Sequence, residues 1–233
     1  EEWEDDRRVP AVKGKPPLLD VRAVHPKGPV RRHHITRKDT PDADDLSIVI
    51  PDHFDARTKW PKCLHPIYMQ GGCGACYSIS SSSVLSDRFC IQSQGKIDVL
   101  LASQEVISCD QQERTCIGGI ADWAFSFLER FGTVPYSCVP YTSFFGKTNA
   151  CTGVQEEIKR GNKCPLRLYA KRHSTARLDD EKKAQRDMLR NGPLVMVFTV
   201  YQDFYHYAGG IYHHVDGARI GKHAVKFIGW GVD

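Results

Sequence analysis

The hydrophobic positions divide the chain into three parts. Residues 1 to 48 hold ten acidic residues, ten basic residues and six prolines, a composition that should make no core of its own. Helical spacing of apolar residues follows, and short β-branched or aromatic runs dominate the last part. We therefore expect a charged extension over residues 1–48, a mainly helical lobe over 49–165 and a partial β-rich lobe over 166–233. The extension is either draped over the surface or disordered, or it is a propeptide remnant or a docking arm.

Three segments have the pattern of helices. Residues 76–92 contain neither Gly nor Pro, so we expect a buried helix there despite the poor helix propensity of the serines at 80–83. The apolar face of this helix would consist of Ile79, Val84, Leu85 and Phe89. Further helices are expected over 121–130 and over 179–190, the latter closed by Asn191, Gly192 and Pro193.

Three short runs near the C-terminus have the pattern of strands. They cover residues 194–200, 210–215 and 224–229 and are separated by Gly, Asp and His. Helices in the first half followed by strands in the second predict an α+β protein with two lobes.

Charge and composition narrow the class of function. The chain has 233 residues and a formal net charge of +4, and its basic residues alternate with acidic ones, so nucleic acid is not expected as the partner. No apolar run approaches the length of about 18 to 20 residues that a membrane-spanning helix requires. The acidic N-terminus also lacks the pattern of a signal peptide, which would therefore be removed or not included.

Nine cysteines, all between residues 63 and 164, predict a disulfide framework. The odd count indicates four bridges and one further thiol, and such a framework forms in an oxidising compartment. Cys73 and Cys76 also have the spacing of one arm of a zinc site or of a redox pair. No second arm of matching spacing and no thioredoxin-like strand pattern accompany them, so we expect no metal and no disulfide-exchange activity.

One segment combines a reactive thiol with a glycine-rich turn. Residues 70–77 read Gln-Gly-Gly-Cys-Gly-Ala-Cys-Tyr and match the signature around the nucleophilic cysteine of papain-like proteases. Cys76 would begin the first helix, where the positive end of the helix dipole favours a thiolate. His223 follows 147 positions later, within the spacing of about 130 to 150 found for the histidine of such enzymes. This pair predicts nucleophilic catalysis.

The sequence from about residue 49 onward resembles the cathepsin B-like branch of the papain family. The resemblance rests on residues 51–61, 87–91, 138–141, 191–204 and 229–231, in addition to the thiol motif. It implies an α+β papain-like fold with a helical left lobe, a β-barrel-like right lobe that is incomplete at the C-terminus, and a cleft between the lobes.

The resemblance also implies roles for individual residues. Cys76 would be the nucleophile and His223 its base, while the Gln70 amide and the Cys76 backbone N–H would stabilise the oxyanion. Substrate would contact Gly74, Gly118, Gly119, Ile120, Met196, Val197 and Ala224, although two adjacent glycines also suit a simple turn. The implied bridges are Cys63–Cys90, Cys73–Cys116, Cys109–Cys151 and Cys138–Cys164, of which the last two pairings are less secure. No metal or organic cofactor is implied.

Several departures bear on the activity. The family's orienting Asn is expected downstream of His223, but the sequence ends at Asp233, so we expect the chain to be part of a longer or processed enzyme. No adjacent His pair lies between Cys138 and Cys164, which favours an endopeptidase over a carboxydipeptidase. The pair at residues 213–214 lies elsewhere and should decorate a strand or a turn. Met196 and Val197 could narrow the substrate pocket.

Two functions remain open. The first is peptide-bond hydrolysis on peptide or protein substrates in a lysosomal, vacuolar or secreted setting, with a prosegment or inhibitor able to occupy the cleft. The second is a catalytically silent homologue that binds protein partners through the cleft or through residues 1–48. Lys222 favours the second, because a cation beside His223 would disfavour an imidazolium.

Overall fold

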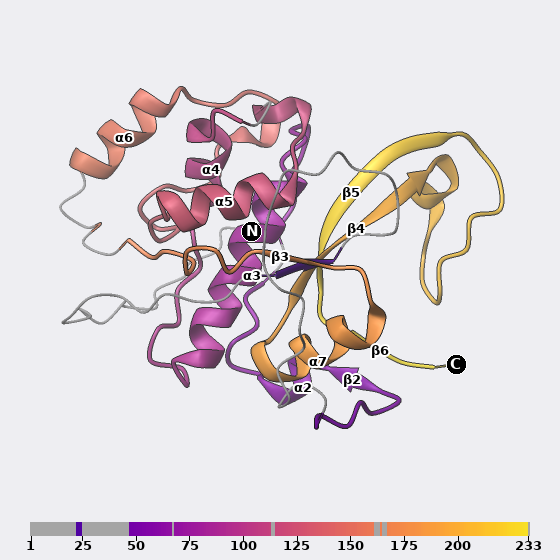
Figure 1. The fold of residues 1–233 in the computed structure, drawn as a ribbon. Helices are drawn as coiled ribbons and strands as arrows, with labels where there is room; N and C mark the ends of the chain where they lie inside the picture. Colours follow the sequence, from indigo (N-terminus) through magenta and orange to yellow (C-terminus); the bar gives the residue numbers. More distant parts are fainter. Residues whose placement is uncertain are drawn as a thin grey trace.

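The computed structural model describes residues 22–24, 47–66, 68–112, 115–160, 164 and 167–232. Most of the predicted extension therefore lies outside the described residues. The helices are α2 (Ala56–Lys59), α3 (Cys76–Gln92), α4 (Ser103–Cys109), α5 (Ala121–Arg130), α6 (Cys151–Arg160) and α7 (Glu181–Asn191), with 3-10 turns η1 (Thr115–Ile117), η2 (Ser143–Phe145) and η3 (Gln202–His206). The strands are β1 (Arg22–Val24), β2 (Phe54–Asp55), β3 (Ala176–Leu178), β4 (Leu194–Tyr201), β5 (Arg219–Phe227) and β6 (Gly229–Trp230). Figure 1 shows α3 to α6 on one side and the sheet on the other.

Helix α3 lies between the helical part and the sheet. Every residue from Tyr77 to Cys90 except Ile79 is buried, and α3 contacts α4 and α5 on one side and β4 and β5 on the other. Two of its buried serines bond to the preceding turn: Ser80 donates to the Cys76 carbonyl at 2.6 Å and Ser86 to the Ser82 carbonyl at 2.7 Å. These i−4 bonds allow a serine-rich segment to remain helical in the core.

The predicted helices agree closely with the structure. The helix predicted over 76–92 and the one over 121–130 have the observed bounds of α3 and α5. Helix α7 begins two residues later than predicted, because the Asp180 side chain caps it by accepting the Lys183 N–H at 2.8 Å.

The larger sheet has the strand order β3-β1-β4-β5. Strand β1 pairs in parallel with both β3 and β4, so residues 22–24 of the predicted extension lie inside the sheet. Strands β4 and β5 pair antiparallel from Leu194–Phe227 to Tyr201–Arg219. Among the described residues this sheet stays open and does not close into a barrel. Mixed helix and sheet content confirms the predicted α+β class.

The strand predicted over 210–215 is wrong. These residues lie in the connection between η3 and β5, outside any strand. The carboxylate of Asp203 organises this connection: it accepts the Tyr212 hydroxyl at 2.5 Å and the backbone N–H of Val215 at 2.7 Å. The Val215 N–H that bonds to this carboxylate is not available to a strand partner. The residues 219–223 instead extend β5 toward the N-terminus beyond the prediction.

Four disulfides stabilise the helical part. They are Cys63–Cys90, Cys73–Cys116, Cys109–Cys151 and Cys138–Cys164, the same pairs that the family resemblance implies. Cys63–Cys90 connects the loop before the glycine-rich segment to the last turns of α3, and Cys109–Cys151 connects α4 to α6. Cys76 takes part in none of the four. Such a framework is typical of proteins from oxidising compartments.

Candidate active site

The glycine-rich loop before Cys76 is fixed by close backbone contacts. Gly71 has φ +64°, and a Cβ there would lie 2.2 Å from the Phe144 carbonyl oxygen. The same oxygen accepts the Gly72 N–H at 2.7 Å. Gly74 donates to the Cys116 carbonyl at 2.8 Å, and a Cβ at Gly74 would also lie 2.8 Å from that oxygen. Only glycine permits these approaches, so the motif's glycines shape the turn that presents the thiol.

Cys76 is the first residue of α3, and its side chain is half-buried. The preceding Ala75 makes no side-chain cap. The positive end of the helix dipole at this terminus favours negative charge on the sulfur. Cys76 packs against the main hydrophobic cluster, to which Ala224 of β5 belongs and against which Val197 of β4 also packs. The structure thereby brings three of the predicted site residues to one cluster.

His223 lies on β5 directly opposite Phe198 of β4. The two rings contact edge to face, with centroids 6.0 Å apart. Burial lowers the pKa of His223 below its ordinary value of 6.5. Lys222, expected to act on His223 by its charge, is exposed, and burial is the cause of the lowered pKa. The imidazole is therefore favoured in its neutral form.

A hydrogen bond to its backbone carbonyl fixes Gln70. Its carbonyl accepts the Tyr141 hydroxyl at 2.6 Å, and burial raises the pKa of Tyr141 to about 12, so the phenol remains a donor. This contact joins Gln70 to the segment after Cys138, which also supplies the Phe144 carbonyl to the glycine loop. Sequence reasoning missed Tyr141 and Phe144, because contacts between segments about 70 residues apart leave no local signal.

The predicted substrate-binding residues fall into two groups. Gly118 lies beside Gly74, since a Cβ built on Gly74 would be 3.0 Å from the Gly118 N. Gly119 and Ile120 follow it and are exposed in front of α5. The second group is on the sheet, where Met196 pairs with Val225 and Val197 with Ala224. Met196 and Val197 are half-buried and Ala224 is 7% exposed.

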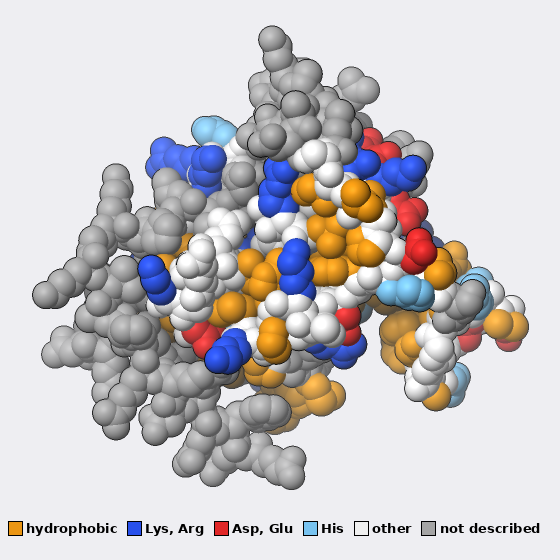
Figure 2. Space-filling view, turned by 90° about the horizontal axis from the view of Figure 1, so that it is seen from below, with side chains coloured by type: hydrophobic (Ala, Val, Ile, Leu, Met, Phe, Trp, Pro, Cys, Tyr) orange, Lys and Arg blue, Asp and Glu red, His pale blue; other side chains and the backbone are white. Residues whose placement is uncertain are grey.

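An open pocket of about 730 Å³ lies elsewhere, on the side of α2, β2 and β6. Its walls include Phe54, Lys59 and Trp230. Figure 2 views the molecule from below Figure 1, the side of these elements, and hydrophobic side chains gather there with Lys and Arg among them. None of the predicted catalytic residues lines this pocket, so it is separate from the thiol site.

The described residues contain neither a candidate metal site nor a candidate membrane span. Within the described ranges, no group of three or more His, Cys, Asp or Glu side chains is placed to hold a metal ion. No helix in that part of the chain is both long enough and apolar enough to cross a membrane.

Residues 50–233 match the model of the papain family of cysteine proteases. The chain belongs to this family. A cathepsin B-like cysteine proteinase of Caenorhabditis elegans, numbered 5, is 35% identical over 225 residues, which cover 82% of this chain and 64% of the relative. Cathepsin B-like cysteine proteinase 4 of the same organism is 32% identical, with 92% of this chain and 73% of the relative covered. The chain lies in the cathepsin B-like branch.

Solved structures agree with this assignment to the papain family. A procathepsin B from Trypanosoma congolense is similar with a TM-score of 0.72 and 28% identity, covering 92% of this chain and 72% of that chain. A digestive procathepsin L of Tenebrio molitor shares the fold at a TM-score of 0.60. The chain spans 64% and 60% of the first two curated relatives.

The remaining thiol hypotheses do not fit this site. Cys73 is bridged to Cys116 and is therefore available neither as a zinc ligand nor as a redox partner of Cys76.

His213 and His214 are exposed in the connection before β5. The ring of His214 stacks on Tyr201, and its Nδ1 lies 3.1 Å from Asp203 Oδ2. That pair thus decorates a turn, as the sequence predicted.

Proposed function

We propose that this papain-family chain hydrolyses peptide bonds through an acyl-enzyme on Cys76. The neutral His223 imidazole takes the proton of the Cys76 thiol as the sulfur adds to the carbonyl carbon, and the Gln70 amide and the Cys76 N–H stabilise the oxyanion. His223 gives its proton to the leaving nitrogen as the C–N bond breaks. Water then adds to the thioester, with His223 taking its proton, and the carboxylic acid product leaves as the Sγ–C bond breaks. No cofactor enters this sequence.

The placement of Cys76 supports this proposal most directly. Eight cysteines are bridged, and the ninth begins α3 at the end of a loop in which a Cβ added at Gly71 or Gly74 would lie less than 3 Å from a backbone oxygen. A cysteine kept only for packing would not require a helix N-terminus. The same thiol packs against the cluster that contains Ala224, the neighbour of His223.

Labelling with an epoxysuccinyl thiol reagent tests the assignment. We expect rapid modification of native protein at Cys76, located by peptide mass spectrometry. The Cys76→Ala variant should not react, and His223→Ala should react far more slowly while the bridged cysteines stay intact. Equal rates for wild type and His223→Ala would show that the thiol is not activated by the histidine. The silent-homologue function would then account better for the chain.

We further propose endopeptidase rather than carboxydipeptidase activity. A carboxydipeptidase needs donors that bind the substrate's terminal carboxylate, and the sequence between Cys138 and Cys164 contains no histidine. Lys147 in that segment is exposed. Matched internally quenched peptides, one ending in a carboxylate and one in an amide, should be cleaved at similar rates and at internal bonds. A strong preference for the free acid that disappears in Lys147→Gln would show the opposite specificity.

The same proposal includes a cellular location and regulation by a prosegment. The disulfides suit a lysosomal, vacuolar or secreted location, and the structural neighbours include proforms. By analogy, we propose that a prosegment occupies the cleft and inhibits the enzyme. Residues 1–48 are the candidate region for this prosegment. Incubation at mildly acidic pH followed by N-terminal sequencing tests it: cleavage before residue 49 together with faster Cys76 labelling supports a prosegment, and faster labelling without cleavage does not.

A further inference from the structure

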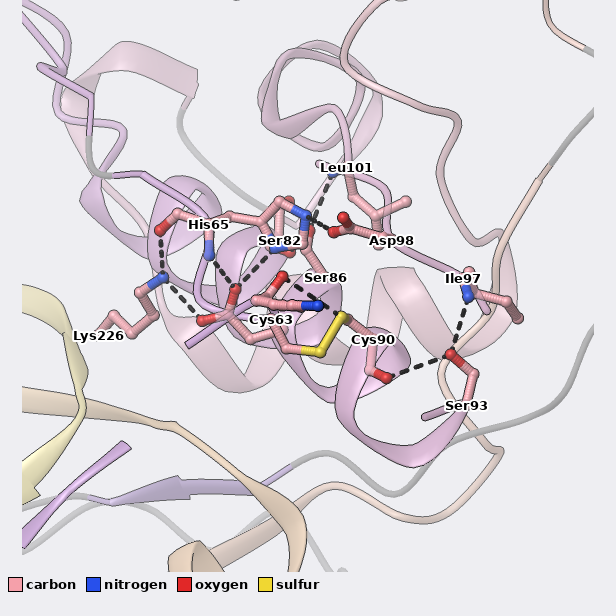
Figure 3. A network of polar contacts seen from close by, with 12 residues as sticks. Cys63, His65, Ser82, Ser86, Cys90, Ser93, Ile97, Asp98, Leu101 and Lys226 are labelled. Atoms are coloured by element: carbon pink, nitrogen blue, oxygen red, sulfur yellow. Dashed lines mark hydrogen bonds and ion pairs between the residues drawn. A yellow bond between two sulfur atoms is a disulfide. The ribbon is translucent and has the colours of Figure 1, made fainter. Parts of the chain in front are cut away.

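A buried network of charges joins the helix of the thiol to the strand of the histidine. Asp87 of α3 is 0% exposed, and its Oδ2 accepts the ammonium of Lys226 on β5 at 2.7 Å. Asp87 Oδ1 accepts both the backbone N–H of His65, at 2.9 Å, and its ring Nδ1, at 2.8 Å. Lys226 also donates to the His65 carbonyl at 3.0 Å. Figure 3 shows Lys226 and His65 beside α3, with Asp98 on the other side of His65.

The loop that carries His65 is itself fixed. Two residues earlier, Cys63 is bridged to Cys90 in the last turns of α3, and the bridge lies beside the network in Figure 3. On the far side of the ring, His65 Nε2 lies 3.1 Å from Asp98 Oδ1. The groups that face one another are therefore two carboxylates, one imidazole and one ammonium, with Lys226 only 9% exposed.

The position of Lys226 along β5 gives the network a consequence for the site. Lys226 follows His223 by three residues on the same strand, roughly 10 Å at about 3.3 Å per residue. Asp87 follows Cys76 by eleven residues on α3, roughly 16 Å at about 1.5 Å per residue. The Ala224 contact with the cluster beside Cys76 is apolar and non-directional, whereas the buried ion pair between Lys226 and Asp87 is directional.

We propose that Lys226 is a positioning residue: through Asp87 it fixes β5 against α3 and so sets His223 relative to Cys76. This inference rests on the proposed acyl-enzyme function. In the described contacts Lys226 touches neither the Cys76 thiol nor the His223 imidazole. It acts on His223 through strand β5. An error of about 1 Å in such an alignment can cost about 100-fold in rate, so a distant substitution should affect the chemistry.

The test compares substitutions in two buried ion pairs of α3. Lys226→Met removes the link to β5, Lys226→Arg preserves a cation, and Asp87→Asn keeps the shape of the acceptor without its charge. The control is Asp187→Asn. This substitution weakens the 2.6 Å ion pair between Arg88 of α3 and Asp187 of α7 and changes no residue of β5. Each full-length variant is examined for its urea midpoint and for the rate of Cys76 modification by an epoxysuccinyl reagent across pH.

We expect Lys226→Met and Asp87→Asn to slow labelling by at least about tenfold at the pH where wild type reacts fastest, with the shape of the pH profile altered. Lys226→Arg should recover the rate to within about threefold. Asp187→Asn should lower the urea midpoint yet label at the wild-type rate while folded. Asp87→Asn serves as the deciding variant if Lys226→Met does not fold.

Two results would overturn the inference and leave the proposed function standing. One is wild-type labelling rates and pH profiles in folded Lys226→Met or Asp87→Asn. The other is an equal loss of rate in Asp187→Asn, which would mark a general effect of lost stability. If wild type and His223→Ala react alike, the pairing of Cys76 with His223 is absent, and both proposals fall together.

Discussion

Replacing Arg88 with Met measures how far the fold depends on one buried cation. Arg88 is 0% exposed. Its guanidinium donates to Asp187 Oδ2 at 2.6 Å, to the Pro193 carbonyl at 2.8 Å and to the Gly192 carbonyl at 3.2 Å. These bonds connect α3 to α7 and to the start of β4. The variant leaves a buried carboxylate and two buried carbonyls without this donor.

The expected loss of unfolding free energy depends on the buried Asp187 carboxylate that remains without its Arg88 partner. Removing one partner of a buried ion pair costs about 3–5 kcal/mol. The Asn191 amide still donates to Asp187 Oδ1 at 2.7 Å, which places the expected loss near the lower end, about 3 kcal/mol. For a chain of this length about 1 kcal/mol shifts Tm by about 2–4 °C, so Tm should fall by about 6–12 °C.

Urea denaturation and thermal melts with the disulfides intact provide the measurement. The double variant Arg88→Met with Asp187→Leu completes the comparison, since it removes the stranded carboxylate as well. We expect the double variant to recover at least about 1 kcal/mol relative to the sum of the single changes. A single-variant loss below about 1 kcal/mol, or strict additivity in the double variant, would refute the reasoning.

Three further predictions concern other parts of the fold. Gly71→Ala combines an unfavourable φ of +64° with a Cβ 2.2 Å from the Phe144 carbonyl, so both the melting temperature and Cys76 labelling should fall; an unchanged labelling rate would contradict the role given to this turn. Burial lowers the pKa of His223, so the unfolded chain binds more protons below pH 6.5, and stability should fall as the pH drops through that value. Urea midpoints at about pH 8 and about pH 5 should therefore differ less in His223→Gln than in wild type, and equal differences would contradict this. Ala23→Pro removes a backbone donor from a strand paired on both sides, which should cost about 1 kcal/mol or more in urea denaturation; no loss would show that β1 contributes little.

Local signals in the sequence predicted helices α3, α5 and α7 and the place of Cys76 at the start of α3. The segment 76–92 is bounded by glycines and lacks internal breakers, so its pattern sufficed even for a helix rich in serine. The short helix α4 and the helix α6 were not predicted. The disulfide Cys109–Cys151 joins these two helices. Tertiary contacts of this kind stabilise helices that the local sequence pattern does not predict.

Long-range contacts explain the rest. Residues 210–215 have a strand-like composition, but the Asp203 carboxylate accepts the Tyr212 hydroxyl and the backbone N–H groups of Val215 and Asp216 and holds this segment in a loop. Lys226 lies 139 positions from Asp87, and in the sequence it is simply one more lysine in a charged chain. Tyr141 and Phe144 support the glycine loop from another segment. No periodicity or motif reveals such partners, because only the folded chain brings them together.

Trapping the acyl-enzyme tests the central claim most directly. The full chain would be mixed with an activated peptide ester, quenched with acid within the first turnover and digested for mass spectrometry. We expect the peptide acyl group as a thioester on Cys76, one per molecule, together with a burst of released alcohol that disappears in Cys76→Ala. Release of alcohol without any acyl group on Cys76, or no reaction by a folded chain, would contradict it.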